Sequence, residues 1–268
     1  MKITALVENK SEGRTIPKHG LSLYIETQKH KILFDLGPDD TLFKNAEIMN
    51  IDLSEVDTVI ISHGHMDHGG ALKRFLQVNR KARIYVQRTA FEPHYSKFLF
   101  LKVNVGLDAD LKSNPQIVLT EGDYQIDEEL SLFTVSRRDK CYSGANDALY
   151  NKSGKDDFLH EQYLVLEERG KRVLISGCAH NGILNILDRY REIYGEEPDV
   201  VISGFHMSRK SDYSQADYAL IRDTARELQK LRTRFFTGHC TGELPYQILR
   251  EIMGEQIAYV HSGEEILL

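Results

Sequence analysis

Short apolar runs joined by turn residues recur in the two halves of the chain. Leu23 to Glu26 and Lys31 to Asp35 flank four polar residues, whereas Tyr163 to Glu167 and Arg172 to Ser176 flank a turn that contains a glycine. Each pair predicts a β-hairpin. The apolar triplets of the two second strands align, and a glycine follows each of them. We interpret this likeness as an internal duplication, although hairpins of unrelated origin also resemble one another.

The remaining hydrophobic pattern predicts strands and helices in both halves. Apolar runs predict further strands at Ile3 to Val7, Val56 to Ile61, Ala82 to Gln87, Leu130 to Val135, Val200 to Ser203, Arg234 to Thr237 and Ala258 to His261. A helical repeat predicts helices at Thr41 to Met49, Ala71 to Gln77, Ile183 to Tyr194, Gln215 to Leu231 and Pro245 to Met253. Two β-rich halves with flanking helices indicate an α/β fold, in which two mixed sheets pack face to face with the helices outside.

The chain is expected to form one domain over residues 1 to 268, because no Pro-rich or Gly/Ser-rich tract divides it. Residues 88 to 129 are the least regular stretch, with charges mixed among aromatic rings and a histidine: Phe91, His94, Tyr95, Phe98 and Phe100. We interpret this stretch as a variable, lid-like insertion that covers a site and selects the substrate. A surface excursion without a role is the alternative.

Charge and composition narrow the classes of partner. The formal net charge is −6 and the charges are interspersed, which argues against a nucleic-acid or membrane surface and favours a small-molecule substrate. Residues 1 to 10 lack the apolar segment of a secretory signal, and no run of about 18 apolar residues occurs. Three widely spaced cysteines fit reduced thiols better than a disulfide framework. We therefore expect a cytoplasmic protein, whose oligomeric state the sequence leaves open.

The hexapeptide His63-Gly64-His65-Met66-Asp67-His68 is the strongest chemical signal in the chain. It follows the apolar run that predicts a strand, so His63 and His65 project to the same side of an extended segment. Asp67 and His68 lie in the turn that follows and can face the same point from a second direction. Imidazole with carboxylate suits zinc, iron or manganese better than ions that prefer oxygen alone. The motif therefore predicts a metal site at the end of a strand.

Two later motifs repeat this arrangement of strand, histidine and helix. Ser176 to Gly182 contains His180 and leads into a predicted helix, and Thr237 to Gly242 contains His239 and does the same. We predict that His180 and His239 supply further ligands to the metal site from the C-terminal half of the chain. A histidine that caps the start of a helix is the alternative for each.

The HxHxDH pattern resembles the signature of the metallo-β-lactamase-fold superfamily, which implies an αββα sandwich with two adjacent metals at one edge. The resemblance implies that the ligands of the hexapeptide are divided between the two metals. We assign His180 to the metal bound by His63 and His65, and His239 to the metal bound by Asp67 and His68. Two divalent ions are expected, with zinc first and iron or manganese as alternatives.

The sequence departs from the β-lactamase-type pattern at two places. Those enzymes carry a metal-bridging aspartate after the second hairpin, where this chain has Cys178, and a histidine in a Gly-rich loop before it. Cys178 would either bridge the metals as a thiolate or be a small buried packing residue. His160 stands before the hairpin, but no glycine flanks it, so it is a weaker candidate for the loop histidine. Binuclearity is thus less firmly predicted than metal binding.

Further candidates surround these ligands. Asp35 matches the aspartate that orients ligand histidines in the family, a simple turn aspartate being the alternative. His206 follows a predicted strand and would touch substrate or cap the next segment. Asn9 and His19 are candidates for the edge of the site.

The motifs HGHMDH, SGCAHNGI, SGFHMS and TGHCTG together resemble a narrower branch, the proteins similar to dihydropterin ribofuranosylaminobenzene phosphate synthase. A metal pair lowers the pKa of bound water towards neutrality and stabilises negative charge on a substrate oxygen, with Asp67 placed to relay a proton. The first hypothesis is a metal-dependent hydrolase of an ester, phosphoester or lactone.

The narrower branch implies a metal-dependent transferase instead, in which a pterin diphosphate is displaced by an arylamine phosphate. Cationic candidates for phosphate recognition are Arg137, Arg138, Lys140, Arg209 and Lys210. A third hypothesis is an iron centre of the kind found in flavin-linked oxygen reductases. The chain carries no recognisable flavin domain and fewer carboxylates than such centres use, which argues against it. A purely binding role is the weakest hypothesis, because an open ligand set is costly to keep without chemistry.

Overall fold

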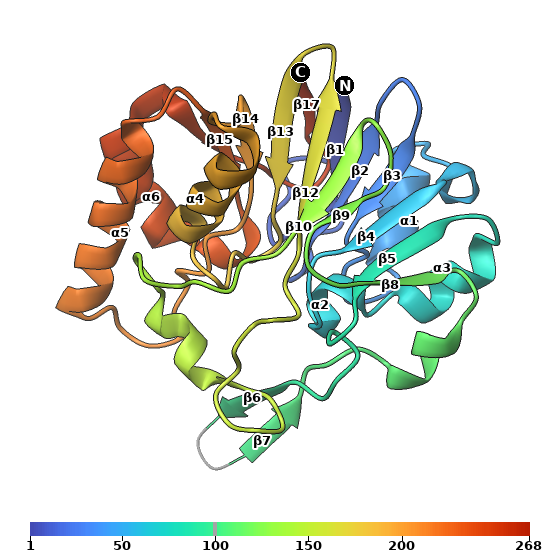
Figure 1. Cartoon of the computed structure of the whole chain (residues 1–268), viewed down its shortest axis with the longest axis horizontal. Coiled ribbons are helices and arrows are strands. Elements are labelled where there is room, and N and C mark those ends of the chain that lie inside the picture. Colours follow the sequence, from blue (N-terminus) through green and yellow to red (C-terminus); the bar gives the residue numbers. More distant parts are fainter. Residues whose placement is uncertain (99–100) are drawn as a thin grey trace.

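Two mixed β-sheets of seven strands each pack face to face in the computed structural model, which describes residues 1–98 and 101–268 (Figure 1). In spatial order, sheet one contains β17 (Glu265–Leu267), β1 (Lys2–Val7), β2 (Ser22–Glu26), β3 (Lys31–Phe34), β4 (Thr58–Ile61), β5 (Arg83–Gln87) and β8 (Ile117–Thr120). Sheet two contains β16 (Ile257–Tyr259), β15 (Arg234–Thr237), β14 (Val200–Ile202), β13 (Lys171–Ile175), β12 (Tyr163–Glu168), β10 (Leu130–Phe133) and β9 (Tyr124–Gln125).

The two sheets repeat one strand order. In sheet one an antiparallel β1-β2-β3 meander is followed by β4, β5 and β8, which run parallel to β3. In sheet two the antiparallel strands β10, β12 and β13 are followed by the parallel strands β14, β15 and β16. This shared order, together with the matching hairpins, supports the interpretation as an internal duplication.

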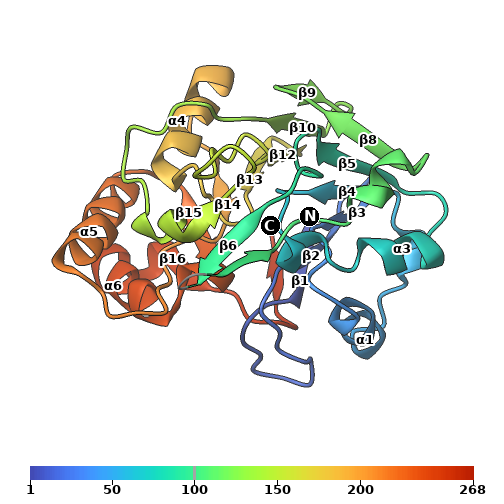
Figure 2. The same cartoon turned by 90° about the horizontal axis from the view of Figure 1, so that it is seen from below.

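Helices cover the outer face of each sheet. Sheet one carries α1 (Thr41–Ile48) and α3 (Leu72–Val78), and sheet two carries α4 (Ile183–Tyr194), α5 (Gln215–Gln229) and α6 (Glu243–Met253) (Figures 1 and 2). Because both faces of each sheet are covered, the middle of each central strand is apolar on both faces. Strand β4 illustrates this: Ile60 packs between the sheets, whereas Val59 and Ile61 pack under the helices. The predicted αββα sandwich is confirmed. No helix in the described part of the chain combines the length and apolarity needed to cross a membrane.

The irregular stretch at 88 to 129 divides into two parts. Its first part projects as an antiparallel hairpin of β6 (Tyr95–Phe98) and β7 (Leu101–Asn104), which β11 (Leu149–Tyr150) extends to a small third sheet. Its second part rejoins the main fold, because β8 and β9 are edge strands of the two large sheets. The stretch is therefore only in part an insertion. Phe100, which the sequence analysis placed in it, lies outside the described residues.

Candidate metal centre

The histidine motifs meet at one edge of the sandwich, where the carboxyl ends of parallel strands from both sheets converge. The hexapeptide follows β4 and continues into the short helix α2 (Met66–Gly69), while His180 follows β13 and His239 follows β15. The backbone is strained here, since Ala179 and His239 both adopt positive φ, at 51° and 48°. Non-glycine residues in this conformation cluster at functional sites.

The first group of donors is formed by His63, His65 and His180. Nε2 of His63 lies 3.0 Å from Nδ1 of His65 and 3.3 Å from Nε2 of His180. A tetrahedral zinc ion with Zn–N bonds of about 2.0–2.1 Å would place its nitrogen ligands roughly 3.3 Å apart, so these spacings fit. Burial, followed by the charge of neighbouring histidines, lowers the pKa of all three well below its ordinary value. The rings are therefore neutral, and each keeps a lone pair for a ligand.

The second group is formed by Asp67, His68 and His239, with Cys178 beside them. Nε2 of His68 lies 3.1 Å from Nε2 of His239 and 3.2 Å from Sγ of Cys178. Oδ2 of Asp67 lies 3.4 Å from Nε2 of His239 and 3.8 Å from that of His68. The two groups are adjacent, because the ring centroids of His63 and His68 are 4.2 Å apart.

Charge sets the protonation of the second group. Burial opposes ionisation of Asp67, but the charge of His68 and hydrogen bonds from His19 and His239 outweigh it and hold the pKa of the carboxyl well below its usual range. Burial likewise disfavours the charged form of His68, yet the carboxylates of Asp35 and Asp67 raise its pKa to about 9. A metal ion at this position would thus replace the proton of His68.

Asp35 holds His68 in place from behind. This fully buried carboxylate accepts from Nδ1 of His68 at 2.6 Å, and it also accepts the backbone N–H and the hydroxyl of Ser62, each at 2.7 Å. Gly177 permits this packing, because a Cβ there would lie 2.3 Å from Oγ of Ser62. The structure therefore places Asp35 where the sequence analysis expected it. An aspartate that accepts from Nδ1 leaves Nε2 free to bind a metal.

Asn9 and His19 lie at the rim beside His239. Oδ1 of Asn9 lies 3.0 Å from Nδ1 of His239, and its amide donates to the backbone carbonyl of His239 at 3.1 Å. Glu8, which the sequence analysis did not single out, accepts the backbone N–H of His239 at 2.6 Å. The side chain of His19 is 68% exposed, and its Nε2 lies 3.4 Å from Oδ2 of Asp67. His19 therefore connects this carboxylate with solvent.

Asn146 and Glu161 orient His180, and the sequence analysis missed both. Nδ1 of His180 lies 2.8 Å from Oδ1 of Asn146, whose amide donates to the carbonyl of His180 at 2.9 Å. Buried Glu161 accepts the backbone N–H groups of His180 and Asn181 at 2.8 and 3.0 Å. Phe158 stacks on the ring of His180 at 4.5 Å. Asn146 lies in a short 3-10 helix (Gly144–Ala148) and the other two in a loop, none with an apolar repeat, and only the position of Glu161 just ahead of the second hairpin gave a signal.

The two less certain histidines are placed differently. His206 contacts the ring of His180 at 4.1 Å between centroids, and its buried Nδ1 has no partner among the described residues. His160 does not join either group of donors. Its Nδ1 accepts the backbone N–H of Gly64 at 2.9 Å, and its Nε2 lies 3.4 Å from a carboxylate oxygen of Asp156.

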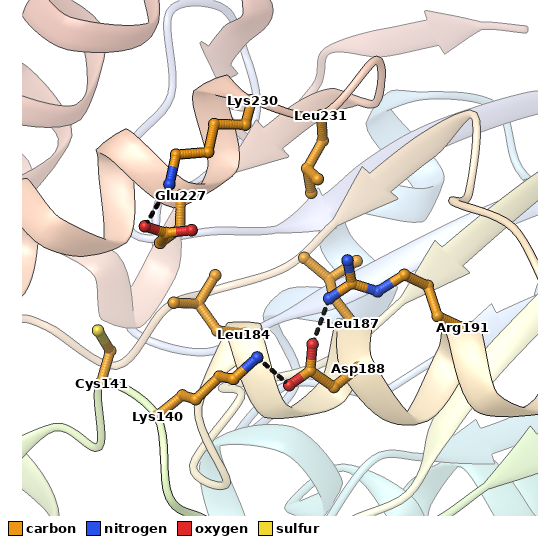
Figure 3. Close-up of a pocket in the computed structure, with 9 residues that line it drawn as sticks. All are labelled: Lys140, Cys141, Leu184, Leu187, Asp188, Arg191, Glu227, Lys230 and Leu231. Carbon is orange, nitrogen blue, oxygen red and sulfur yellow. Dashed lines mark hydrogen bonds and ion pairs between the residues drawn. The ribbon is translucent and has the colours of Figure 1, made fainter.

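Carboxylates pair with three of the five candidate cations for phosphate recognition, of which exposed Arg137 pairs with Asp139. Lys140 lines a groove of about 460 Å³ between α4 and α5, where it and Arg191 both pair with Asp188 (Figure 3). Arg209 donates two hydrogen bonds to Asp217, at 3.0 and 2.6 Å. Leu184, Leu187 and Leu231 form the apolar part of the groove, which lies in the helical layer (Figure 3).

Comparisons with known proteins agree with this architecture. Residues 15–139 match the family model described as the metallo-beta-lactamase superfamily. The chain is 27% identical, over 99% of its length and 96% of the relative's, to 7,8-dihydropterin-6-methyl-4-(beta-D-ribofuranosyl)-aminobenzene-5'-phosphate synthase from Methanocaldococcus jannaschii.

Solved structures extend the likeness. Tm1679, described as a metal-dependent hydrolase of the beta-lactamase superfamily, superposes with a TM-score of 0.83 at 28% identity and covers 100% of this chain and 99% of its own. Zn²⁺-bound PqqB from Methylobacterium extorquens shares the fold, with a TM-score of 0.61 at 12% identity and full coverage of both chains. The buried His/Asp groups are consistent with the metal site of these folds.

Proposed function

The chain belongs to the metallo-β-lactamase superfamily, and from this premise we propose that it is a metal-dependent hydrolase of an ester, phosphoester or lactone bond in a small molecule. The observation that carries the proposal is the pair of adjacent donor groups at one edge of the sandwich. The first metal would be held by His63, His65 and His180, and the second by Asp67, His68 and His239. Zinc is the proposed metal, because nitrogen, carboxylate and thiolate donors in compact groups suit it.

When bound, the ions would supply a hydroxide nucleophile near neutral pH and positive charge beside the substrate oxygen. Asp67 contributes a carboxylate that is ionised and 24% exposed, so its Oδ2 can accept a hydrogen bond from the nucleophilic water and orient it. Exposed His19, whose Nε2 lies 3.4 Å from this oxygen, can carry the released proton to solvent. Asp35 and Asn9 keep the donor atoms of His68 and His239 directed into the site.

Cys178 is a further candidate ligand of the second metal. It stands where β-lactamase-type enzymes carry a metal-bridging aspartate. Its Sγ lies 3.2 Å from Nε2 of His68, in the same group as His239. Burial raises the pKa of this thiol well above its usual value, so it is neutral in the metal-free protein. A metal ion would favour the thiolate and so recruit Cys178 as a ligand.

The test is metal content per chain, measured by elemental mass spectrometry on protein purified without chelator. We expect two equivalents in the wild type and about one in His180→Ala, because the second group does not use His180. His261→Ala, which removes a histidine paired with Glu264 outside both donor groups, should keep both equivalents. A wild type without metal would overturn the proposal. So would a loaded protein that hydrolyses no member of a phosphoester and lactone panel.

The transferase function remains the second candidate, favoured by the full-length likeness to the M. jannaschii synthase. It needs cations that bind two phosphorylated substrates, and Lys140 and Arg209 are already paired with Asp188 and Asp217. We therefore place hydrolysis first. Incubating the loaded protein with a pterin diphosphate and an arylamine phosphate separates the two functions, since only a transferase would form the coupled product.

A further inference from the structure

A second histidine cluster lies directly behind metal-ligand candidate His65. It consists of His94, Asp156 and His160, and each of these residues has a donor atom within 4.8 Å of one on His65 and on each other. All four side chains are buried. The functional assignments above use none of the three. Nε2 of His65 and of His94 lacks a hydrogen-bond partner among the described residues, and Nε2 of His160 faces only Oδ1 of Asp156, at 3.4 Å and without hydrogen-bond geometry.

The neighbours of each ring define its tautomer. Nδ1 of His94 lies 2.8 Å from Oδ2 of Asp156, so Nδ1 carries the proton and Nε2 is an acceptor. His160 accepts the N–H of Gly64 at Nδ1, so its Nε2 carries a proton. If His65 binds the first metal through Nδ1, the atom that faces Nε2 of His63, its Nε2 also carries a proton. The buried N–H donors of His65 and His160 and the acceptor Nε2 of His94 therefore lie close to one another.

These tautomers argue against a third metal ion. A metal needs a lone pair from each ligand, and of the three partnerless nitrogens only Nε2 of His94 has one. Binding through His65 or His160 would require an imidazolate. A water molecule has the complementary capacity, because it can accept two hydrogen bonds and donate one. Buried waters typically make about three hydrogen bonds of this kind.

The projecting hairpin carries His94 to this position. A Cβ at Gly64 would lie 2.8 Å from Nε2 of His94, so the ring sits against the backbone between His63 and His65. On the same segment, Val105 donates to the carbonyl of His94 at 2.9 Å and accepts from the backbone N–H of Met66 at 2.7 Å. The first bond closes the base of the hairpin, and the second joins the hairpin to the hexapeptide beside the cluster.

We propose that one buried water links His65, His94 and His160, and that His94 is a positioning residue which fixes the ring of His65 for the first metal. The inference rests on the proposed metal function, because it uses the assignment of His65 as a ligand. Asp156 anchors the array by accepting from His94. The lid-like hairpin would then be part of the support of the metal centre as well as a cover for it.

Three variants of His94 separate this role from simple packing. His94→Leu removes both nitrogens. His94→Asn keeps a donor near Nδ1 for Asp156 but has no group near Nε2, whereas His94→Gln keeps an acceptor near Nε2. We expect the affinity for the first zinc ion to fall about 10- to 100-fold in the Leu and Asn variants, and to be largely restored in the Gln variant.

The assay is zinc titration against a chromophoric competing chelator, which resolves the two binding steps. Affinity for the second ion, held by Asp67, His68 and His239, should stay within about twofold in every variant, which also shows that the variants are folded. His261→Gln serves as the matched control and should leave both steps unchanged.

The possible outcomes separate a failure of the proposed function from a failure of the inference about His94. A wild type that binds no zinc overturns the proposed function and this inference together. Two ions bound with unchanged affinity in all three variants overturn this inference alone. Rescue by Asn but not by Gln would mean that His94 acts only through Asp156, which contradicts the water link. A third zinc equivalent that His94→Leu abolishes would show a metal where we place a water.

Discussion

The buried Asp35–His68 pair makes the stability of the metal-free protein depend on pH. The pKa of His68 is raised from 6.5 to about 9, which corresponds to about 3.5 kcal/mol at ~1.4 kcal/mol per pH unit. Because the folded-state pKa lies above the unfolded one, this stabilisation is complete below pH 6.5 and is lost as the pH rises through 9. Asp35→Asn should remove much of it. The substitution should add little backbone strain, because Asp35 adopts φ 62° and asparagine tolerates that conformation.

The assay is urea unfolding of chelator-treated protein at pH 6, 8 and 10. We expect Asp35→Asn to be less stable than the wild type at pH 6, and the gap to narrow by about 2 kcal/mol at pH 10, where His68 is neutral in both proteins. Asp39→Asn is the matched control: the pKa of Asp39 is about 2, so its gap should not change over this range. A gap between wild type and Asp35→Asn that stays constant from pH 6 to 10 would refute the reasoning.

Three further predictions concern the supports of the centre. Asn146→Ala frees Nδ1 of His180 and should weaken binding of the first metal about 10- to 100-fold, measured by competitive chelation. Gly177→Ala places a Cβ 2.3 Å from Oγ of Ser62 and should lower the unfolding free energy by about 1–3 kcal/mol; unchanged stability in urea would contradict the packing described. Removing metal with a chelator should lower the thermal unfolding temperature, and adding zinc should restore it, because a ligand that binds only the folded state stabilises it.

The strands and helices that support the centre could be predicted from the sequence, because apolar periodicity records burial directly. Strand β4 reads as a continuous apolar run because both of its faces are covered, and α4 has the predicted bounds. The six proposed metal ligands also converge as expected, since each follows a strand whose carboxyl end reaches the same edge. Their role as ligands stays a prediction.

The supports of the ligands were harder to predict. Asn146 lies in a short 3-10 helix, and Asp156 and Glu161 lie in loops, so no apolar repeat fixes which way these side chains point. His94 belongs to a hairpin that a main-chain bond from the N–H of Met66 to the carbonyl of Val105 joins to the hexapeptide, and such a bond leaves no pattern in the sequence. His160 shows the converse. Its place before the second hairpin suggested a ligand, whereas its hydrogen bond from Gly64 makes it part of the scaffold.

The repeated strand order of the two sheets has a consequence for metal exchange. His63 and His65 belong to the first repeat and His180 to the second, and the same division separates Asp67 and His68 from His239. Each proposed ion would therefore tie one repeat to the other, as a cross-link that forms only in the folded protein. An ion could leave only when the repeats part locally at this edge. The lifetime of the bound metals would then report how often the sandwich opens there.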